Sequence, residues 1–447
     1  MSNRLSRSFF RATAMVVVTG VIASVASCSS DSKDSSSDSA LPSYSELVNP
    51  DHKVTVTWLD AANTNVQIGS TVKKFEAEYP NIKIKYESVP FADFETVLPS
   101  RLKSGNVDVI TVDQHLTARY VAAGYLRDIT PVFKSEFGAL DDASLAASTV
   151  DGKLYNAPEQ SDSSFLFYNK KLLERAGASL PSSDPSKPAT WEQITADAKK
   201  AQKSGAEYGI TWERIASWYY QWLLSQGLGG GYGAEGSHNL TPNLDSEAAV
   251  KTFGWYADLY KDKVSPQGDA NSVYTSLFAS GKSAFHIGGD WDIAELNKNK
   301  NLDYGIAPMP RFAAGKAVSN AGGVALGLYK GSKNEDAALT FIKAMVFKGP
   351  GAAAYDTDTS SPPANNEGKK LYWRQEAFRD PRAAGAQKIV NYQLSHGIAK
   401  KRVSTVGWNE LNSALTSALL SISNGEDVAK TLESAQSTAD AALEKYR

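Results

Sequence analysis

Four polar residues that can hydrogen-bond a ligand stand directly behind two predicted strands. Asp60 and Asn63 follow the β-branched run at 53–59, and Asp113 and Gln114 end a later apolar run. Carboxylates and amides can hydrogen-bond a polar ligand, and open α/β sheets bind ligands at the carboxyl ends of their strands. Carboxylates can also hydrolyse glycosides, a chemistry that leaves no spacing signal in a sequence. We therefore predict a ligand site at this edge, for capture or for hydrolysis.

Other motif matches do not fit their chemistry. The run Gly231–Gly236 satisfies G-x-G-x-x-G, but it follows a predicted helix, whereas a dinucleotide site places this run between a strand and a helix. The run Gly281-Lys282-Ser283 lacks the glycine that a phosphate-binding loop has five residues earlier, where Ser276 stands. The five histidines are scattered and there is one cysteine, so we expect no metal, no other cofactor and no intramolecular disulfide.

The composition is that of an ordinary folded protein. The chain has 447 residues, of which 42% are hydrophobic and 21% charged, so bulk disorder is excluded and two or three domains are expected. The net charge of −2 leaves no basic excess for binding a nucleic acid electrostatically. These values predict a soluble protein that does not bind nucleic acid.

The first residues are typical of a targeting segment and not of a folded domain. Three arginines precede an apolar stretch at 12–25, which is shorter than the ~20 apolar residues of a membrane-spanning helix. The stretch ends in Val25-Ala26-Ser27-Cys28, which resembles the lipobox of bacterial lipoproteins. We expect a signal peptide at 1–27, a lipid anchor on Cys28, and a tether rich in Ser and Asp over 28–50. The body would then be extracytoplasmic, anchored to the outer face of the cell membrane.

Strands and helices alternate through the first part of the body. Strands are expected at 53–59, 82–89 and 107–112, with helices at 65–78, 93–104 and 115–123. This alternation predicts an α/β protein with open, mostly parallel sheets and helices on both faces. Later helices are expected at 191–203, 215–226, 246–262, 290–298, 334–347, 409–421 and 427–445, and later strands at 165–168, 283–287 and 323–329. Thr190 and Gln193 form a capping box at the first of these helices.

A series of short motifs runs along the chain in a fixed order. It includes Phe75-x-x-x-Tyr79-Pro80-x-Ile82, Ser104-Gly105-x-x-Asp108-Val109, Asp151-Gly152-Lys153-Leu154-Tyr155, Tyr168-Asn169-Lys170 and Gly281-Lys282-x-Ala284-x-x-x-Gly288-x-x-Trp291. From about Lys53 to the C-terminus, the chain thereby resembles the extracellular solute-binding proteins of ABC importers, family 1, the sugar-binding family that includes the maltodextrin binders.

The resemblance implies the type II periplasmic-binding-protein fold, with two α/β lobes, hinge segments between them and a ligand cleft. We place the crossovers near 157–162, 317–321 and 359–363. Lobe 1 would hold 51–160 and 321–360, and lobe 2 would hold 161–317 and 361–447. Such lobes close by hinge bending, and a ligand drives closure only by binding the closed state better.

The resemblance also points to residues that would contact a sugar. The C–H faces of a pyranose stack on aromatic rings. Relatives carry such rings at positions matching Trp291 and Trp408, and an aromatic of the Trp218–Tyr219 pair can enter the cleft from lobe 2. Asp162 stands where relatives place a cleft carboxylate at the hinge, with Glu159 as an alternative.

The sequence departs from the maltodextrin pattern at Val112, where those binders carry an aromatic, so we expect an oligosaccharide other than maltose. The shortage of arginine near the proposed positions favours a neutral sugar. The resemblance implies a monomer that captures a di- or oligosaccharide without catalysis and delivers it to the transmembrane subunits of an ABC permease. The alternatives are a lipid-anchored glycoside hydrolase, or the same fold with a solute other than a sugar.

Overall fold

The computed structural model describes residues 49–62, 68–213, 216–228, 240–267, 273–351 and 361–446. Its helices are α1 (Ile68–Glu78), α2 (Phe94–Lys103), α3 (Thr117–Ala122), α4 (Thr130–Phe133), α5 (Asp142–Ala147), α6 (Lys170–Arg175), α7 (Trp191–Lys203), α8 (Ala216–Ser225), α9 (Glu247–Lys261), α10 (Val273–Ala279), α11 (Ile293–Lys298), α12 (Glu335–Val346), α13 (Asn366–Tyr372), α14 (Ala386–Ser395), α15 (Trp408–Ser423) and α16 (Val428–Leu443). The predicted signal peptide, Cys28 and nearly all of the tether lie outside the described residues.

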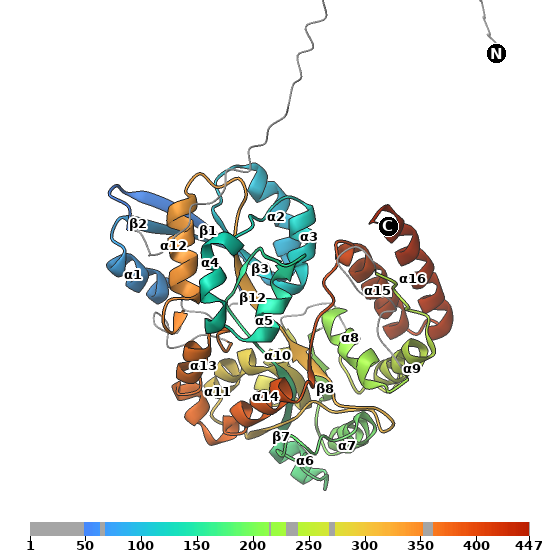
Figure 1. The fold of residues 1–447 in the computed structure, drawn as a ribbon. Coiled ribbons are helices and arrows are strands. Elements are labelled where there is room, and N and C mark those ends of the chain that lie inside the picture. Colours follow the sequence, from blue (N-terminus) through green and yellow to red (C-terminus); the bar gives the residue numbers. More distant parts are fainter. Residues whose placement is uncertain are drawn as a thin grey trace, which may run out of the picture. The chain divides into compact units, whose positions relative to one another are not determined.

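The strands form two main sheets (Figure 1). The first has the order β2 (Ile82–Pro90), β1 (Val54–Ala62), β3 (Val109–Asp113), β12 (Val324–Leu328) and β6 (Ala157–Pro158). The second has the order β10 (Tyr304–Ala307), β7 (Ser164–Asn169), β9 (Ser283–Gly289) and β8 (Tyr208–Trp212). Two small ribbons pair β4 (Thr149–Val150) with β5 (Lys153–Leu154), and β11 (Ser319–Ala321) with β13 (Ala399–Lys401).

The α/β class is confirmed, but the sheets are mixed rather than mostly parallel. In the first sheet β1 runs parallel to β2 and β3, whereas β12 runs antiparallel to β3 and β6. In the second sheet only β8 and β9 are parallel. Strand β12 is the antiparallel strand of the first sheet. It follows the strands of the second sheet in the sequence, and the chain returns to the first sheet in the direction opposite to β1, β2 and β3.

The strands β3, β7 and β9 are buried on both faces, which explains their continuous runs of buried residues, whereas the edge strand β2 alternates between buried and exposed residues. Along β1, Val56 and Trp58 pack into one apolar cluster, whereas Leu59 and Ala61 pack into another. In the second sheet, all six residues of β7 are buried. Successive side chains of a strand point to opposite faces of the sheet, so β1 contributes residues to the hydrophobic clusters on both faces.

Three chain segments pass between the two sheets and lie against one another. The first joins β6 to β7, the second joins β11 to β12, and the third includes Pro362. The Ser161 amide donates to the Pro362 carbonyl at 2.8 Å, and the Asp162 amide donates to the Gly322 carbonyl at 2.8 Å. We call these three segments the crossing segments. They bring residues from distant parts of the sequence to the boundary between the sheets.

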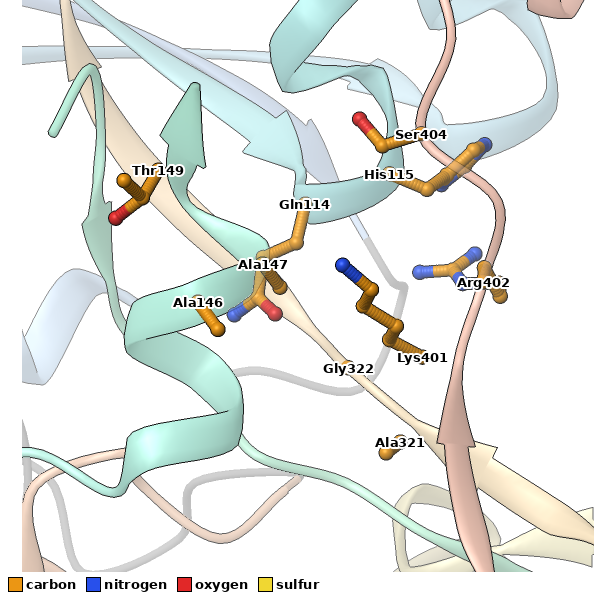
Figure 2. Close-up of a pocket in the computed structure, with 10 residues that line it drawn as sticks. All are labelled: Gln114, His115, Ala146, Ala147, Thr149, Ala321, Gly322, Lys401, Arg402 and Ser404. Carbon is orange, nitrogen blue, oxygen red and sulfur yellow. The ribbon is translucent and has the colours of Figure 1, made fainter. Parts of the chain in front are cut away.

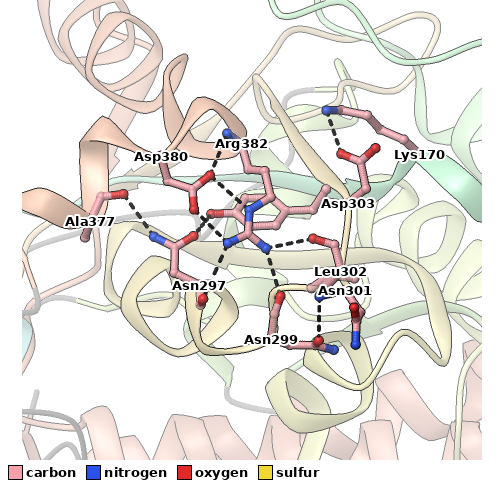
Figure 3. Close-up of polar contacts among 10 residues, drawn as sticks. Lys170, Asn297, Asn299, Asn301, Leu302, Asp303, Ala377, Asp380 and Arg382 are labelled. Atoms are coloured by element: carbon pink, nitrogen blue, oxygen red, sulfur yellow. Dashed lines mark hydrogen bonds and ion pairs between the residues drawn. The ribbon is translucent and has the colours of Figure 1, made fainter.

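Arg382 anchors the segment before α14 to the second sheet (Figure 3). Its guanidinium donates to the Asp380 carboxylate at 2.7 Å and to the carbonyls of Asn299 and Leu302 at 2.9 and 2.7 Å. It also lies 5.2 Å from the centroid of the Tyr304 ring. Charge-assisted hydrogen bonds are stronger than neutral ones, so this arginine fixes the route by which the chain reaches α14.

Candidate functional site

The predicted residues at the end of β3 meet the C-terminal part of the chain through an ion pair. Arg402, directly after β13, donates through both terminal nitrogens to the Asp113 carboxylate, and the Nη1–Oδ2 distance is 2.8 Å. The side chains are 12% and 8% exposed, so water screens the pair weakly. Burial alone would raise the pKa of Asp113, but the charges of Arg402 and then His115 hold that pKa below its usual range. Asp113 is therefore ionised, and it is already partnered within the chain.

His115 and Trp408 form the next layer of this group. The two rings meet edge to face with their centroids 4.5 Å apart, and Trp408 is 6% exposed. The His115 Nδ1 atom lies 3.1 Å from the Asp113 carboxylate. Burial lowers the pKa of His115, although Asp113 opposes that shift. The layer presents aromatic surface beside an ion pair, a combination suited to polar molecules with apolar faces.

Gln114 is tied to the crossing segments at both ends of the residue. Its backbone amide donates to the Gly323 carbonyl at 3.1 Å, and its side-chain Nε2 donates to the Gln160 carbonyl at 3.0 Å. Its Oε1 atom is buried and has no hydrogen-bond partner among the described residues. A buried acceptor without a partner is costly, so this oxygen is available for a donor from a ligand or from water.

A small cavity lies beside Gln114, with a volume of about 40 Å³. Figure 2 shows Gln114 and Lys401 on opposite sides of it, with Gly322 between them. A cavity of this size holds water but not a sugar ring. The residues that line it come from two parts of the sequence: Gln114, His115, Ala146, Ala147 and Thr149 from the first, and Ala321, Gly322, Lys401, Arg402 and Ser404 from the second.

Asp162 lies within the crossing segments, next to the ion pair. Its Oδ1 atom accepts a hydrogen bond of 3.0 Å from the Asn320 side chain. Burial raises the pKa of Asp162 to about 7; Asp113 adds to the rise, whereas Arg402 opposes it. Asp290, which accepts from the Ser163 amide at 3.3 Å, is buried as well, and burial followed by the charge of Asp162 raises its pKa well above the usual range. The boundary between the sheets thus holds carboxyl groups that are easily protonated.

These shifts predict how stability depends on pH. A carboxyl whose pKa is higher in the folded state than in the unfolded state stabilises the fold at low pH, and this contribution is lost as the pH rises toward the folded pKa. We expect the free energy of unfolding to fall from pH 5 to pH 7. Asp162→Asn should remove about 1 kcal/mol per pH unit of that slope.

Urea denaturation at pH 5, 6, 7 and 8 measures this slope, with the exposed Asp245→Asn as the matched control. Glu95 and Glu213 keep part of the slope in every variant, because burial raises the pKa of each to about 7. Parallel curves for Asp162→Asn and the wild type would contradict the assignment.

Asp60 was expected at the ligand site, but its carboxylate is hydrogen-bonded to neighbouring strands within the first sheet. Its carboxylate accepts hydrogen bonds from the Tyr86 hydroxyl at 2.8 Å and the Thr111 hydroxyl at 2.5 Å, and the residue is 7% exposed. Burial raises its pKa, although both hydroxyls oppose the shift. These bonds join β2, β1 and β3, so in this structure Asp60 holds the edge of the sheet together.

The aromatic residues predicted to contact a ligand lie in different places in the structure. Tyr219 is 2% exposed, with its ring centroid 5.4 Å from that of Trp222 and 5.6 Å from that of Tyr256, so the structure places it in an aromatic core instead of the polar group. Trp222 itself is a core residue, as expected. Trp291 is partly buried and covers Gly289, where a Cβ would overlap the indole. Asn63 and the side chain of Trp218 lie outside the described residues.

Sequence patterns did not indicate Arg402, Lys401, His115 or Asn320 as members of this group. The expected shortage of arginine was wrong, because Arg402 lies against Asp113 and Lys401 lines the cavity. Arg402 follows a short basic strand and stands 289 residues from Asp113, so no local pattern joins them. Arg402 directly follows β13, which pairs with β11.

Across the described ranges, no three His, Cys, Asp or Glu side chains are grouped so that they could hold a metal ion. In that same part of the chain, every helix is too short or too polar to cross a membrane.

Comparison with known proteins gives a consistent result. The model of the family "Bacterial extracellular solute-binding protein" matches residues 61–352. The galactooligosaccharide-binding protein of Bacillus subtilis is 29% identical over 340 residues, which cover 73% of this chain and 74% of the relative. The maltooligosaccharide ABC transporter solute-binding lipoprotein of Streptococcus pneumoniae is 26% identical over 377 residues, covering 82% and 83%.

A solved structure shares the fold. The ABC substrate-binding protein of Listeria monocytogenes, solved in complex with cycloalternan, aligns with a TM-score of 0.75 at 20% identity, over 87% of this chain and 98% of that one. This agreement confirms the periplasmic-binding-protein fold. Because the family model spans well over half of the chain, the protein belongs to the bacterial extracellular solute-binding proteins, the non-catalytic solute-binding components of ABC transporters.

Proposed function

We propose that the protein captures a neutral di- or oligosaccharide at the boundary between its two sheets and delivers it to the transmembrane subunits of an ABC permease. The observation that carries the proposal is the convergence of Asp113, Gln114, Asp162 and Trp408 on one region, with a buried Gln114 oxygen lacking a partner. Planar polar groups beside an indole suit a pyranose, which has hydroxyls at its rim and apolar faces.

Charge in this region supports a neutral ligand. The positive charge of Arg402 is compensated by Asp113. A phosphate ester would need basic groups without acidic partners. The printed names of the two relatives, a galactooligosaccharide binder and a maltooligosaccharide binder, support a saccharide as the cargo.

The crossing segments serve as the hinge in this proposal. We assign lobe 1 to 51–160 and 321–360, and lobe 2 to 161–317 and 361–447. The backbone hydrogen bonds at Ser161 and Asp162 support a hinge there, because they join all three segments. The ligand would drive closure by touching groups on both sides of the segments.

The proposal includes a lipid anchor on Cys28, which would hold the body at the outer face of the membrane on a tether over 28–50. The support is the Val25-Ala26-Ser27-Cys28 sequence and the lipoprotein among the relatives.

Thermal unfolding of the purified protein with a panel of saccharides tests the cargo. The panel holds the di- and trisaccharides of the malto-, galacto-, cello- and chito- series, with spermidine and glucose 6-phosphate as charged comparisons. A ligand at ~1,000 times its Kd stabilises by about 4 kcal/mol, which raises the midpoint by about 8–16 °C for units of lobe size.

Mass spectrometry of the recovered sugar separates the alternatives. An intact saccharide with a large shift is the expected result. Degraded saccharide would favour the glycoside hydrolase. A shift with spermidine or the phosphate ester, and none with any saccharide, would overturn the proposed cargo.

A further inference from the structure

The turn at 288–292 carries Trp291 to the boundary between the two sheets. Gly289, at the end of β9, pairs with the first residue of β7, directly after a crossing segment. The Asp290 carboxylate accepts a hydrogen bond of 3.3 Å from the Ser163 amide in that segment. The indole of Trp291 lies on Gly289 so closely that a Cβ there would overlap the ring. The course of this turn therefore sets the place of the indole.

The Asp292 carboxylate folds back over the turn that precedes it. Its Oδ2 atom accepts a hydrogen bond of 3.3 Å from the Gly289 amide, and its Oδ1 atom accepts one of 3.1 Å from the Thr275 hydroxyl on α10. A Cβ on Gly288 would overlap the same Oδ2 atom, so glycine is needed there to leave room for the carboxylate. Asp292 thus ties the end of the turn to its beginning.

His286 stands beside this carboxylate in the core of the second sheet. Its Nε2 atom lies 3.4 Å from the Asp292 Oδ2 atom, and the two side chains are 1% and 8% exposed, so water screens their attraction weakly. Its Nδ1 atom lies 3.0 Å from the Thr211 hydroxyl on β8. The ring also packs against Phe167 and Phe278, with its centroid 6.0 and 5.6 Å from theirs. These contacts hold the imidazole, and the imidazole in turn holds Asp292.

Stability alone does not account for polar groups at this depth. Replacing a buried ion pair by apolar side chains of similar size is often neutral or stabilising, because the charges lose their hydration when they are buried. What the pair of His286 and Asp292 supplies is direction. A carboxylate with a charged neighbour and two hydrogen-bond donors has one favourable place over Gly288, and that place fixes the turn.

We infer that His286 and Asp292 are positioning residues for Trp291: they fix the turn at 288–292 so that the indole lies on Gly289 and faces a saccharide at the boundary between the sheets. The inference rests on the proposed function and adds to it the buried pair that orients an aromatic contact. Neither residue of the pair would touch the ligand, so their effect on affinity would pass through the indole.

Fluorine NMR of protein labelled with fluorotryptophan reads the environment of the indole without any ligand. The Trp291 resonance is the one that disappears in Trp291→Phe. His286→Phe keeps a planar ring but removes both nitrogens, so it should shift or broaden that resonance. His286→Gln keeps a nitrogen donor and should largely restore it. Gly288→Ala displaces the Asp292 carboxylate without removing a polar group, so it should shift the resonance too, and it keeps the test open if His286→Phe does not fold.

Calorimetric titration gives the second measurement, with the panel saccharide that raises the unfolding midpoint most as the probe. His286→Phe and Gly288→Ala should each weaken binding by about tenfold, the value of one well-placed aromatic contact. Trp291→Ala should cause a similar loss. Because the pair acts through the indole, adding His286→Phe to Trp291→Ala should cause no further loss of affinity.

Thr252→Val is the matched control. It removes a buried hydroxyl that accepts a hydrogen bond of 3.1 Å from the Gln226 side chain, on α9, which packs against α8, α15 and α16. It should destabilise the protein and change neither the Trp291 resonance nor the affinity.

Two results would overturn the positioning role and leave the proposed function standing. One is a Trp291 resonance that stays in place in His286→Phe and Gly288→Ala. The other is a loss of affinity from His286→Phe that is as large in the Trp291→Ala background as in the wild type. A wild type that binds none of the panel saccharides would overturn the proposed function and the ligand-orienting role with it, whereas the fluorine spectra alone decide whether the pair holds the indole.

Discussion

Arg402→Met should lower the free energy of unfolding by about 3–5 kcal/mol, because it leaves the Asp113 carboxylate buried without its counter-ion. Asp113 is 8% exposed and its nearest remaining titratable partner, His115, is itself held toward the neutral form by burial. Urea denaturation at pH 7 measures the loss. Lys445→Met, which breaks an exposed ion pair with Glu410, is the matched control and should cost about 1 kcal/mol or less.

The double variant separates the pair from its members. Asp113→Asn with Arg402→Met removes both charges, so it should cost less than the sum of the two single losses. Arg402→Lys keeps the charge but cannot donate through a planar fork, so its loss should lie between that of the wild type and that of Arg402→Met. A loss below about 1 kcal/mol for Arg402→Met would show that water or another group compensates Asp113.

The same pair bears on ligand capture. Asp113 ends β3 in the first sheet, whereas Arg402 lies directly after β13, and β13 pairs with a strand beside the crossing segments. The ion pair therefore stabilises the arrangement in which the end of β3 lies against the segment after β13. A ligand that binds here must form its contacts with Asp113 and Arg402 without separating them, which favours hydroxyl groups over a charged group that would compete for either partner.

Local sequence patterns predicted the helices and strands whose capping residues or apolar runs lie within a few residues of one another. Helix α7 begins and ends where the sequence predicts, and the Gln193 backbone amide donates to the Thr190 hydroxyl at 3.2 Å, which is one of the two hydrogen bonds of the predicted capping box. Strands β7 and β9 follow from apolar runs that are buried throughout.

Other elements left no such pattern. Helix α13 carries a glycine and two lysines within seven residues and has no apolar repeat, although Asn365 caps it through two amides. Strand β8 is five residues long and contains Gly209, whose missing side chain admits Val264 and Ala198. Such elements form because of what packs against them, which a single sequence does not display.

The residues of the candidate site also fall into two groups: those that one strand is enough to predict, and those whose partners lie far away in the sequence. Asp113 and Gln114 were predicted because parallel strands end at one edge, a rule that needs only the strand. Arg402 required the β11–β13 pairing, and the role of Asp60 required the Tyr86 and Thr111 hydroxyls from its two neighbouring strands. Side chains whose partners lie far away in sequence can be placed only once the topology is known.

Trp408→Ala should lower the free energy of unfolding by about 3–5 kcal/mol, the usual cost of removing a buried tryptophan. The residue opens α15, is 6% exposed and packs on the edge of His115. If the indole also contacts the ligand, affinity should fall at least tenfold in protein that remains folded. Titration calorimetry well below the midpoint of each variant measures that affinity. Trp408→Phe keeps an aromatic face and should lose less of both quantities.

Trp373 supplies the matched control for this experiment. It packs against Tyr372 and Phe378, with ring centroids 4.8 Å from each, in a satellite of the core on the second sheet. Trp373→Ala should therefore destabilise the protein and leave the ligand affinity unchanged. A Trp408→Ala variant that behaves in the same way would assign Trp408 to the core alone. Ligand recognition would then depend on Gln114 and the groups around the Asp113–Arg402 pair.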